Sequence, residues 1–222
     1  VDDDIMIYGV YSEGFRASGI NRVRPAQTAF IPELFDADYL ESLEFGVKST
    51  LNDGKLILNA AYYQMDWYDF QTTAYNPDLA GVAYVDNIGD AEITGFELDI
   101  TYLINDVTSV TAYFNSNDPT LSEDYYGDEG VLTANAGNRL SNMPKSSYYL
   151  SLDRDIVLMG LPGFLNIDYS FVGDRFSTFE NVSSGSDIRE VLPSYGLANM
   201  RLGVEMDNSI TVSYTHLRAH ET

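Results

Sequence analysis

The sequence predicts an all-β fold, namely an antiparallel up-and-down β-barrel segment that crosses a membrane with about nine strands. Three observations predict it. Apolar and polar residues alternate along most of the chain, and successive side chains of a strand point to opposite faces of a sheet. Short turns and long loops take turns between the alternating segments. Aromatic residues make up 13% of the chain and occur near the segment ends, where a membrane interface favours them.

A hairpin over residues 42–63 shows the alternation most clearly. Leu43 and Phe45 fall on one face of its first strand, whereas Glu44 and Lys48 fall on the other. An Asn-Asp-Gly-Lys sequence supplies the turn, because Asn and Asp tolerate positive φ and Gly adopts it freely. The return strand alternates for about fifteen residues, whereas a soluble strand typically has roughly five or six. This length favours a strand that crosses a membrane.

The other elements follow in order along the chain. We expect strands over residues 5–13, 96–102, 110–115, 147–153, 165–171 and 198–205, and a last strand that begins at Ser209. We expect long loops over residues 14–38, 73–84, 117–139 and 177–193, and tight turns at residues 105–106, 160–163 and 207–208. The second of these turns contains Pro162, a residue type that is poorly tolerated inside a sheet.

Composition excludes several functions. The chain has 34 acidic and 12 basic residues among 222, and its net charge of −22 would repel a nucleic acid backbone. It contains no Cys, so a disulfide scaffold and a thiolate metal site are excluded. Its two histidines, His216 and His220, both lie near the C-terminus, so we expect no Ser-His-Asp triad and no enzyme. No apolar run is long enough for a transmembrane helix.

Alternation by itself leaves a second fold open. A soluble secreted β-sandwich, such as a carbohydrate-binding or adhesin domain, also alternates. In that case the acidic loop over residues 117–139 would be a candidate calcium site. Because the loop lacks the ligand spacing of an EF-hand, we expect a solvated loop, no metal site and no cofactor. Strand length, the pattern of connections and the aromatic residues favour the barrel.

Several motifs resemble those of one family. The segment from Tyr8 to Arg16 resembles a strand that reads Tyr-x-x-Tyr-Ser-x-Gly-Phe-Arg in the C-terminal barrel half of TonB-dependent outer-membrane receptors. Further resemblances to strands of this family follow in the same order, at residues 43–48 with 58–63, 87–97, 138–145 and 193–203. Each motif is weak alone, but together they cover about 205 residues.

The resemblance implies a role in transport. Such receptors are 22-stranded barrels of the Gram-negative outer membrane, filled by a plug domain. They import scarce nutrients, such as siderophore-bound iron, vitamin B12 or oligosaccharides, with energy from an inner-membrane TonB complex. The expected partners are therefore outer-membrane lipid, a small nutrient ligand, and the plug and TonB complex of the full-length protein.

The same resemblance indicates an incomplete barrel. About nine strands are present, and the chain has neither a plug nor a TonB box. We expect residues 1–211 to be a partial receptor barrel. Residues 212–222 carry both histidines and abandon the preceding alternation, and they resemble translated sequencing read-through. We therefore expect these residues to be a tail that is not native to the barrel.

Candidate site residues fall into two sets. Polar residues of the predicted inner face are expected to line the lumen: Glu44, Lys48, Glu97, Asp99, Asp168 and Arg201. Candidate ligand-binding residues lie in or beside the long loops: Arg16, Arg22, Arg24, Tyr75 and Phe176. The arginines are the only basic cluster and would attract an anion such as a ferric siderophore. Structural roles stay open, since lumen residues also bind one another, loop arginines bind lipopolysaccharide phosphate, and aromatic residues form interface girdles.

Overall fold

The computed structural model describes residues 4–22, 24, 31–76, 82–126, 132–177, 190–206 and 209–220. The side chains of residues 75, 76, 209, 210 and 216–220 are outside this description. All regular secondary structure in the described residues is β-strand. None of them forms a helix that is long and apolar enough to span a bilayer.

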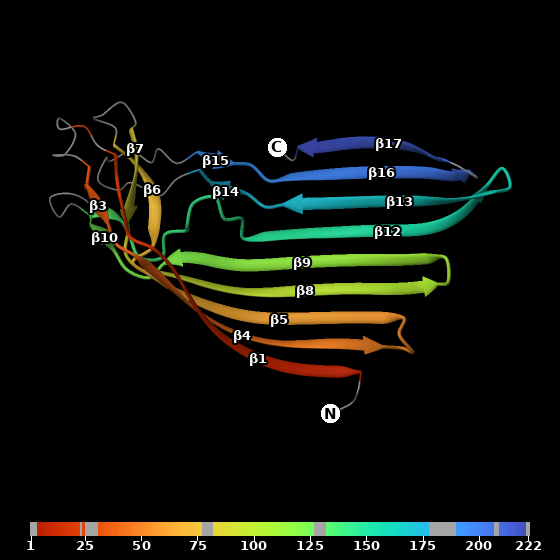
Figure 1. Cartoon of the computed structure of the whole chain (residues 1–222), viewed down its shortest axis with the longest axis horizontal. Helices are drawn as coiled ribbons and strands as arrows, with labels where there is room; N and C mark the ends of the chain where they lie inside the picture. The colour runs from red at the N-terminus through yellow and green to blue at the C-terminus, as the bar shows by residue number, and fades with distance from the viewer. Residues whose placement is uncertain are drawn as a thin grey trace.

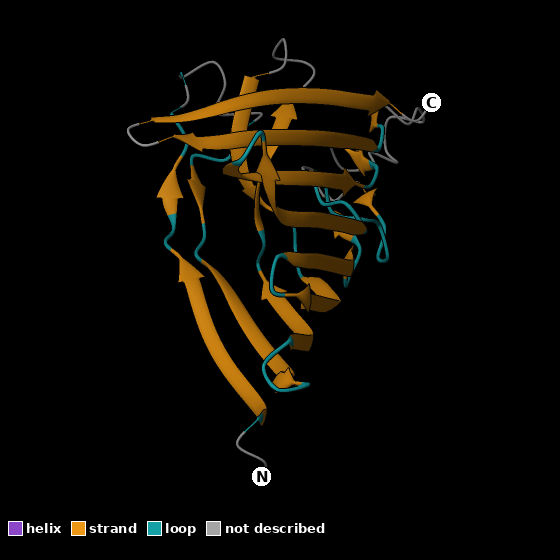
Figure 2. Ribbon diagram, turned by 90° about the vertical axis from the view of Figure 1, so that its right-hand side faces the viewer, coloured by secondary structure: helices purple, strands orange, loops and turns teal. Residues whose placement is uncertain are grey.

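Nine long strands form one antiparallel sheet, in which each strand pairs with the next long strand of the sequence (Figure 1). They are β1 (Ile5–Arg16), β4 (Asp38–Leu51), β5 (Leu56–Tyr68), β8 (Ala91–Asn105), β9 (Thr108–Leu121), β12 (Ser146–Leu158), β13 (Leu161–Val172), β16 (Tyr195–Met206) and β17 (Ser209–His220). The predicted up-and-down topology is confirmed. Figure 2 shows a single twisted and curved layer, and β1 and β17 do not pair with each other, so the sheet is not closed.

The connections alternate between short turns at one end of the sheet and long loops at the other (Figure 1). The long loops contain short strands that pair within each loop: β2 (Gly19–Ile20) with β3 (Leu34–Phe35), β6 (Gln71–Asn76) with β7 (Val82–Asn87), β10 (Tyr125–Tyr126) with β11 (Leu132–Ala134), and β14 (Arg175–Phe176) with β15 (Val191–Leu192). These small hairpins were not predicted, because such short pairs hold too few residues for a periodic pattern.

The first short turn has the expected chemistry. Asn52, Asp53 and Gly54 have φ of 55°, 54° and 83°, in the left-handed region that these residue types tolerate. The turn between β12 and β13 differs from the prediction, because Pro162 lies inside β13 and not in the turn. Pro162 precedes the first β13 residue that pairs with β16, Gly163, and a strand tolerates proline where one of its sides has no partner.

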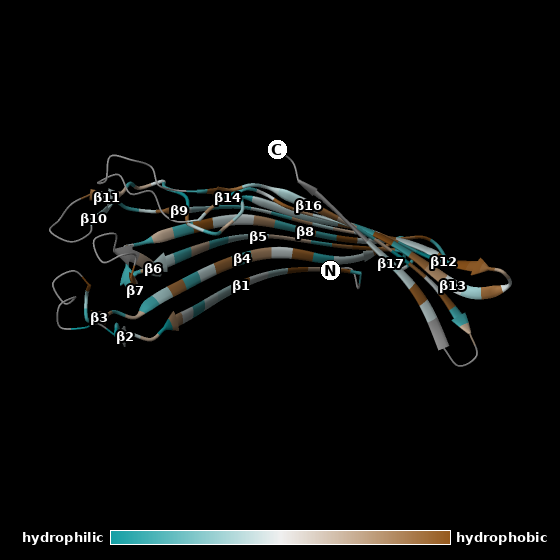
Figure 3. Cartoon of the chain, turned by 90° about the horizontal axis from the view of Figure 1, so that it is seen from above, coloured by the Kyte–Doolittle hydropathy of each residue, from teal (hydrophilic) through white to brown (hydrophobic). Residues whose placement is uncertain are grey.

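The strand register separates a polar face from an apolar face. Glu44 and Tyr63 are cross-strand partners on the polar face. Phe45, Tyr62 and Phe96 are consecutive partners in one row of the apolar face. Figure 3 shows the alternation as hydrophobic and hydrophilic bands along the strands. Many large side chains of the apolar face are exposed, including Ile7, Leu43, Phe45, Tyr62, Phe96, Tyr102, Phe114, Tyr148, Leu150, Ile167 and Met200.

The buried core lies at the long-loop end of the polar face and not in the middle of the sheet. Strand residues meet loop residues there, in a cluster of Tyr63, Phe70, Ile88, Ala91, Ile93, Leu121, Ala134 and Leu140. Met65, Trp67, Tyr125 and Met143 pack against this cluster, and the Trp67 and Phe70 rings meet edge to face at 4.4 Å. The loops therefore fold over the polar face, while the apolar face stays uncovered within the described residues.

The last strand crosses the expected boundary of the non-native tail. β17 pairs with β16 from Met206 opposite Ser209 to Tyr195 opposite His220. The pairing is continuous through residues 211 and 212. The foreign origin of residues 212–222 remains a prediction.

Candidate functional site

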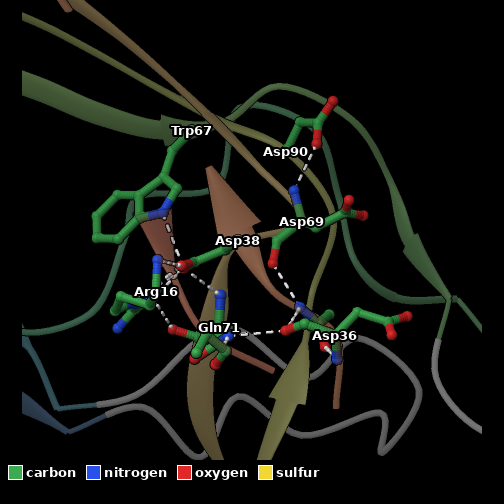
Figure 4. Close-up of polar contacts among 9 residues, drawn as sticks. Arg16, Asp36, Asp38, Trp67, Asp69, Gln71 and Asp90 are labelled. Atoms are coloured by element: carbon green, nitrogen blue, oxygen red, sulfur yellow. Dashed lines mark hydrogen bonds and ion pairs between the residues drawn. The ribbon is translucent and has the colours of Figure 1, made fainter. Parts of the chain in front are cut away.

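Asp38, the first residue of β4, is the centre of a hydrogen-bond cluster at the long-loop end (Figure 4). Its carboxylate is 1% exposed and pairs with the Arg16 guanidinium. The Arg16 Nε lies 3.0 and 2.9 Å from its two oxygens. The indole Nε1 of Trp67 donates to it at 2.9 Å, and the backbone N–H of Gln71 donates at 3.1 Å. One carboxylate thereby joins three strands and the loop that follows β5.

The strand register explains why these side chains meet. Arg16 ends β1 directly opposite Asp38, so both side chains lie on the polar face. Arg16 Nη2 also donates to the Gln71 carbonyl at 2.7 Å, and its guanidinium lies 4.9 Å from the centre of the Trp67 ring. The Gln71 side-chain amide donates to the Asp36 carbonyl at 2.7 Å, which ties the first long loop to the second.

The surroundings of Asp38 favour the ionised form of its carboxyl group. Asp38 is the first residue of β4 and lies at its long-loop end, before the predicted membrane-spanning hairpin that begins at residue 42. Burial alone raises the pKa of a carboxyl group. The hydrogen bonds from Arg16 and Gln71, together with the Arg16 charge, outweigh burial and hold the pKa of Asp38 below its usual value.

The arginines predicted to bind a ligand have different surroundings. Arg16 is engaged by Asp38 and Gln71, although 49% of its side chain is exposed. Arg22 and Arg24 are exposed in the loop between β1 and β4. These two residues are therefore the more accessible basic groups of the predicted cluster.

The two predicted aromatic ligand residues lie in different loops. The Tyr75 backbone pairs with Ala83 in the β6–β7 hairpin, and its side chain is outside the described residues. Phe176 is half-buried in β14, and the centre of its ring lies 5.6 Å from the Arg139 guanidinium carbon. Arg139 also donates to the Met143 carbonyl at 3.1 Å and to the Asp174 carboxylate at 3.2 Å. Phe176 thus takes part in a contact that joins the β9–β12 loop to the β13–β16 loop.

The six residues predicted to line the lumen all lie on the polar face, in three groups. On β4, Glu44 accepts a hydrogen bond of 2.7 Å from the Tyr8 hydroxyl, and the Lys48 ammonium lies 5.4 Å from the centre of the Tyr8 ring. On β8, Glu97 accepts from the Asn115 amide at 3.2 Å. Asp99 accepts from the Asn59 amide at 3.3 Å.

The third group joins β13 and β16. Asp168 is 4% exposed and accepts a hydrogen bond of 2.6 Å from the Asn199 amide. Arg201 Nη2 lies 3.6 Å from the other carboxylate oxygen, and 49% of its side chain is exposed. This pairing places a positive charge beside the buried carboxylate. The polar face is thus a wall of hydrogen-bonded and charged side chains, and its role as a lumen lining remains a prediction.

Sequence reasoning missed two arrangements. The Asp38 cluster needs the partners Trp67 and Gln71, whose proximity depends on register and on a loop. The second arrangement is an acidic row on the apolar face, toward the loops, in which Glu13, Glu41, Asp66 and Glu92 are successive cross-strand partners. Because side chains alternate between the two faces of a strand, the sequence places Glu41 on the same face as Leu43. This pattern reveals acidic residues on the apolar face, but it does not show that they are neighbours across the strands. The described residues contain no group of three or more acidic or histidine side chains arranged to hold a metal.

Comparison with known proteins identifies the family. The sequence model of the family described as "TonB dependent receptor-like, beta-barrel" matches residues 1–215. The chain belongs to this family. No curated protein matches its sequence. The match agrees with the up-and-down order of the sheet, since outer-membrane barrels have antiparallel strands joined by short turns and long loops.

Solved structures of bacterial receptors have the same fold over most of this chain. The ferric yersiniabactin uptake receptor FyuA from Yersinia pestis is 19% identical, with a TM-score of 0.73 over 96% of this chain and 30% of that one. The ferric preacinetobactin receptor BauA from Acinetobacter baumannii is 14% identical, with a TM-score of 0.64 over 98% and 30%. The pyoverdine-bound FpvA of P. aeruginosa is 15% identical, with a TM-score of 0.62 over 94% and 26%. The chain therefore spans less than a third of these receptors.

Proposed function

We propose that this chain forms part of the wall of a TonB-dependent receptor that imports a scarce nutrient across the Gram-negative outer membrane. In this role the apolar face contacts lipid and the polar face contacts the lumen. The long loops lie outside the cell, and the short turns lie in the periplasm. The wall does no covalent chemistry, and transport depends on the plug and the TonB complex of the full-length protein.

One observation carries this proposal: the same sheet has two different faces and two different ends. Apolar and polar side chains divide between its faces, and short and long connections divide between its ends. A soluble sandwich would bury its apolar face against a second sheet. Within the described residues nothing packs on the apolar face, and its large side chains are exposed. Lipid is the environment in which such a surface is stable.

Among the three ligand classes, we favour an iron-siderophore complex over vitamin B12 and oligosaccharides. Arg22 and Arg24 are exposed in the first long loop, although the chain carries a net charge of −22. Basic groups at the outer mouth would attract an anionic complex. The similar structures of FyuA, BauA and FpvA, whose names include ferric siderophores or pyoverdine, support the same class.

Uptake by whole cells tests the proposal. Cells that express the full-length protein are given radiolabelled ferric siderophores, cobalamin or oligosaccharides, with and without a functional TonB complex. We expect TonB-dependent accumulation of a ferric siderophore. Uptake of one of the other ligands would overturn the ligand class. A purified chain that stays monomeric and melts cooperatively in detergent-free buffer would overturn the membrane assignment itself.

A further inference from the structure

The turn between β12 and β13 has an apolar tip that its own conformation does not explain. Met159 and Gly160 form this turn with φ of 54° and 83°. A residue other than glycine is disfavoured at positive φ, with Asn and Asp the best tolerated, as at Asn52 and Asp53 in the β4–β5 turn. Met159 is also 96% exposed. Neither local conformation nor burial among the described residues accounts for a methionine here.

A hollow lies beside this tip. It has a volume of about 480 Å³ and lies between the β8–β9 turn and the end of the β12–β13 hairpin. Its lining is mainly apolar, with Val107, Val157 and Phe164, and it includes the carboxylates of Asp155 and Glu205. Val157 is 76% exposed. Neither carboxylate has a hydrogen bond or an ion pair with another described residue.

The hollow adjoins an open strand edge. β12 pairs with β9 only as far as Arg154 opposite Thr108, whereas its pairing with β13 continues to Leu158. The N–H of Asp155 donates to the Val107 carbonyl at 2.9 Å, and beyond this contact the hairpin extends past the β8–β9 turn (Figure 1). Peptide groups of a strand alternate in direction, so Val157 turns its N–H and C=O to the same open side as Asp155.

We propose that this edge and hollow dock an extended segment of a separate periplasmic protein, one that carries a Lys or Arg next to an apolar residue. The segment adds a strand beside Val157, and backbone hydrogen bonds hold it there. Its apolar side chain fills the space against Phe164 and Val157. Its basic side chain lies between Asp155 and Glu205, which no described cation neutralises. The periplasmic source of the partner rests on the proposed orientation of the short turns.

Peptide binding to the full-length protein in detergent tests this docking site. The probe is a fluorescent peptide of alternating Lys and Val with blocked ends, measured by anisotropy at low salt. A peptide with Glu in place of Lys controls for charge, and one with a central Pro controls for strand addition. We expect the Lys-Val peptide to bind more tightly than either control. The double variant Asp155→Asn, Glu205→Gln should weaken its binding about 3- to 10-fold.

The matched variant is Asp53→Asn, which removes a carboxylate from another short turn at the same end. It should change the affinity by less than about 2-fold, because Asp53 does not line the hollow and the interaction between two charges weakens with distance. Equal binding of the Lys and Glu peptides, or equal binding to the double variant and the unmodified protein, would overturn the proposal. Absence of binding of the Lys-Val peptide to the full-length protein would also overturn it. Membrane insertion and uptake are measured separately, so their failure is distinguishable from failure of docking.

Discussion

The ring of Tyr63 on β5 lies over Gly95 of β8, its direct cross-strand partner on the polar face. A Cβ at Gly95 would overlap the Tyr63 ring and hydroxyl. Tyr8 covers Gly46 in the same way between β1 and β4. The absence of a side chain at each glycine lets a tyrosine lie flat against the wall, and the Tyr8 hydroxyl then reaches Glu44.

We predict that Gly95→Val destabilises the sheet, because the Tyr63 ring must leave its place. The cost of overpacking is about 1–3 kcal/mol. Urea unfolding of the full-length protein in detergent measures it, with the tryptophan fluorescence of Trp67 as the probe. Gly14→Val is the matched control, since a Cβ at Gly14 would meet no atom within 4 Å. Equal losses for the two variants would show that Tyr63 does not depend on the space above Gly95.

A second prediction concerns the Asp38 cluster. Asp38→Asn removes the acceptor of Arg16 and leaves buried donors without full partners, which costs about 1–3 kcal/mol. We expect the first long loop to open, because Arg16 and Gln71 tie it to the second long loop. Hydrogen exchange should therefore speed up at the backbone amides of Arg16 and Gln71. Asp36→Asn is the control, because Asp36 uses only its backbone groups in this network. Unchanged exchange in Asp38→Asn would contradict the assigned role.

The long strands were predictable because two local signals agreed. Alternation fixed which residues share a face, as at Leu43 and Glu44, and turn chemistry fixed the ends, as at Asn52 to Gly54. Strand limits were less accurate, since β8 begins at Ala91 and β9 ends at Leu121. Pairing continues there beyond the alternating residues, because backbone hydrogen bonds between neighbouring strands do not require an apolar side chain.

The candidate sites were less predictable, because they depend on contacts between distant segments. Arg16 was identified as basic, but its partner Asp38 lies 22 residues away and is opposite it only in the β1–β4 register. Gln71 joins the same cluster from the start of β6, a short strand within the second long loop that is too short to give a clear periodic signal. Polar alternation placed Asp168 and Arg201 on one face, whereas their contact required the pairing of β13 with β16. The sequence therefore indicated which residues are charged or polar, but it did not indicate which of them lie next to one another.

A third prediction concerns the acidic row. Glu41 lies directly opposite both Glu13 and Asp66, and like charges in this arrangement destabilise a sheet. We expect Glu41→Gln to raise the free energy of unfolding by about 0.2–1 kcal/mol. The gain should shrink as salt screens the charges. Urea midpoints at low and high ionic strength measure it, with Asp53→Asn as the control for loss of one charge. A destabilised Glu41→Gln protein would mean that the row is compensated by another group.

A fourth prediction tests the orientation of the sheet. The chain contains no Cys, so a single thiol introduced here reports only its own position in a full-length protein whose other parts also lack Cys. Met159 and Arg22 are both exposed, at the short-turn end and in a long loop respectively. With the long loops outside the cell, a membrane-impermeant maleimide should label Arg22→Cys on intact cells that express the full-length protein. It should label Met159→Cys only after the outer membrane is permeabilised. Labelling of Met159→Cys on intact cells would reverse the assignment of the two ends and would remove the periplasmic side from which the hollow beside Val157 is proposed to bind.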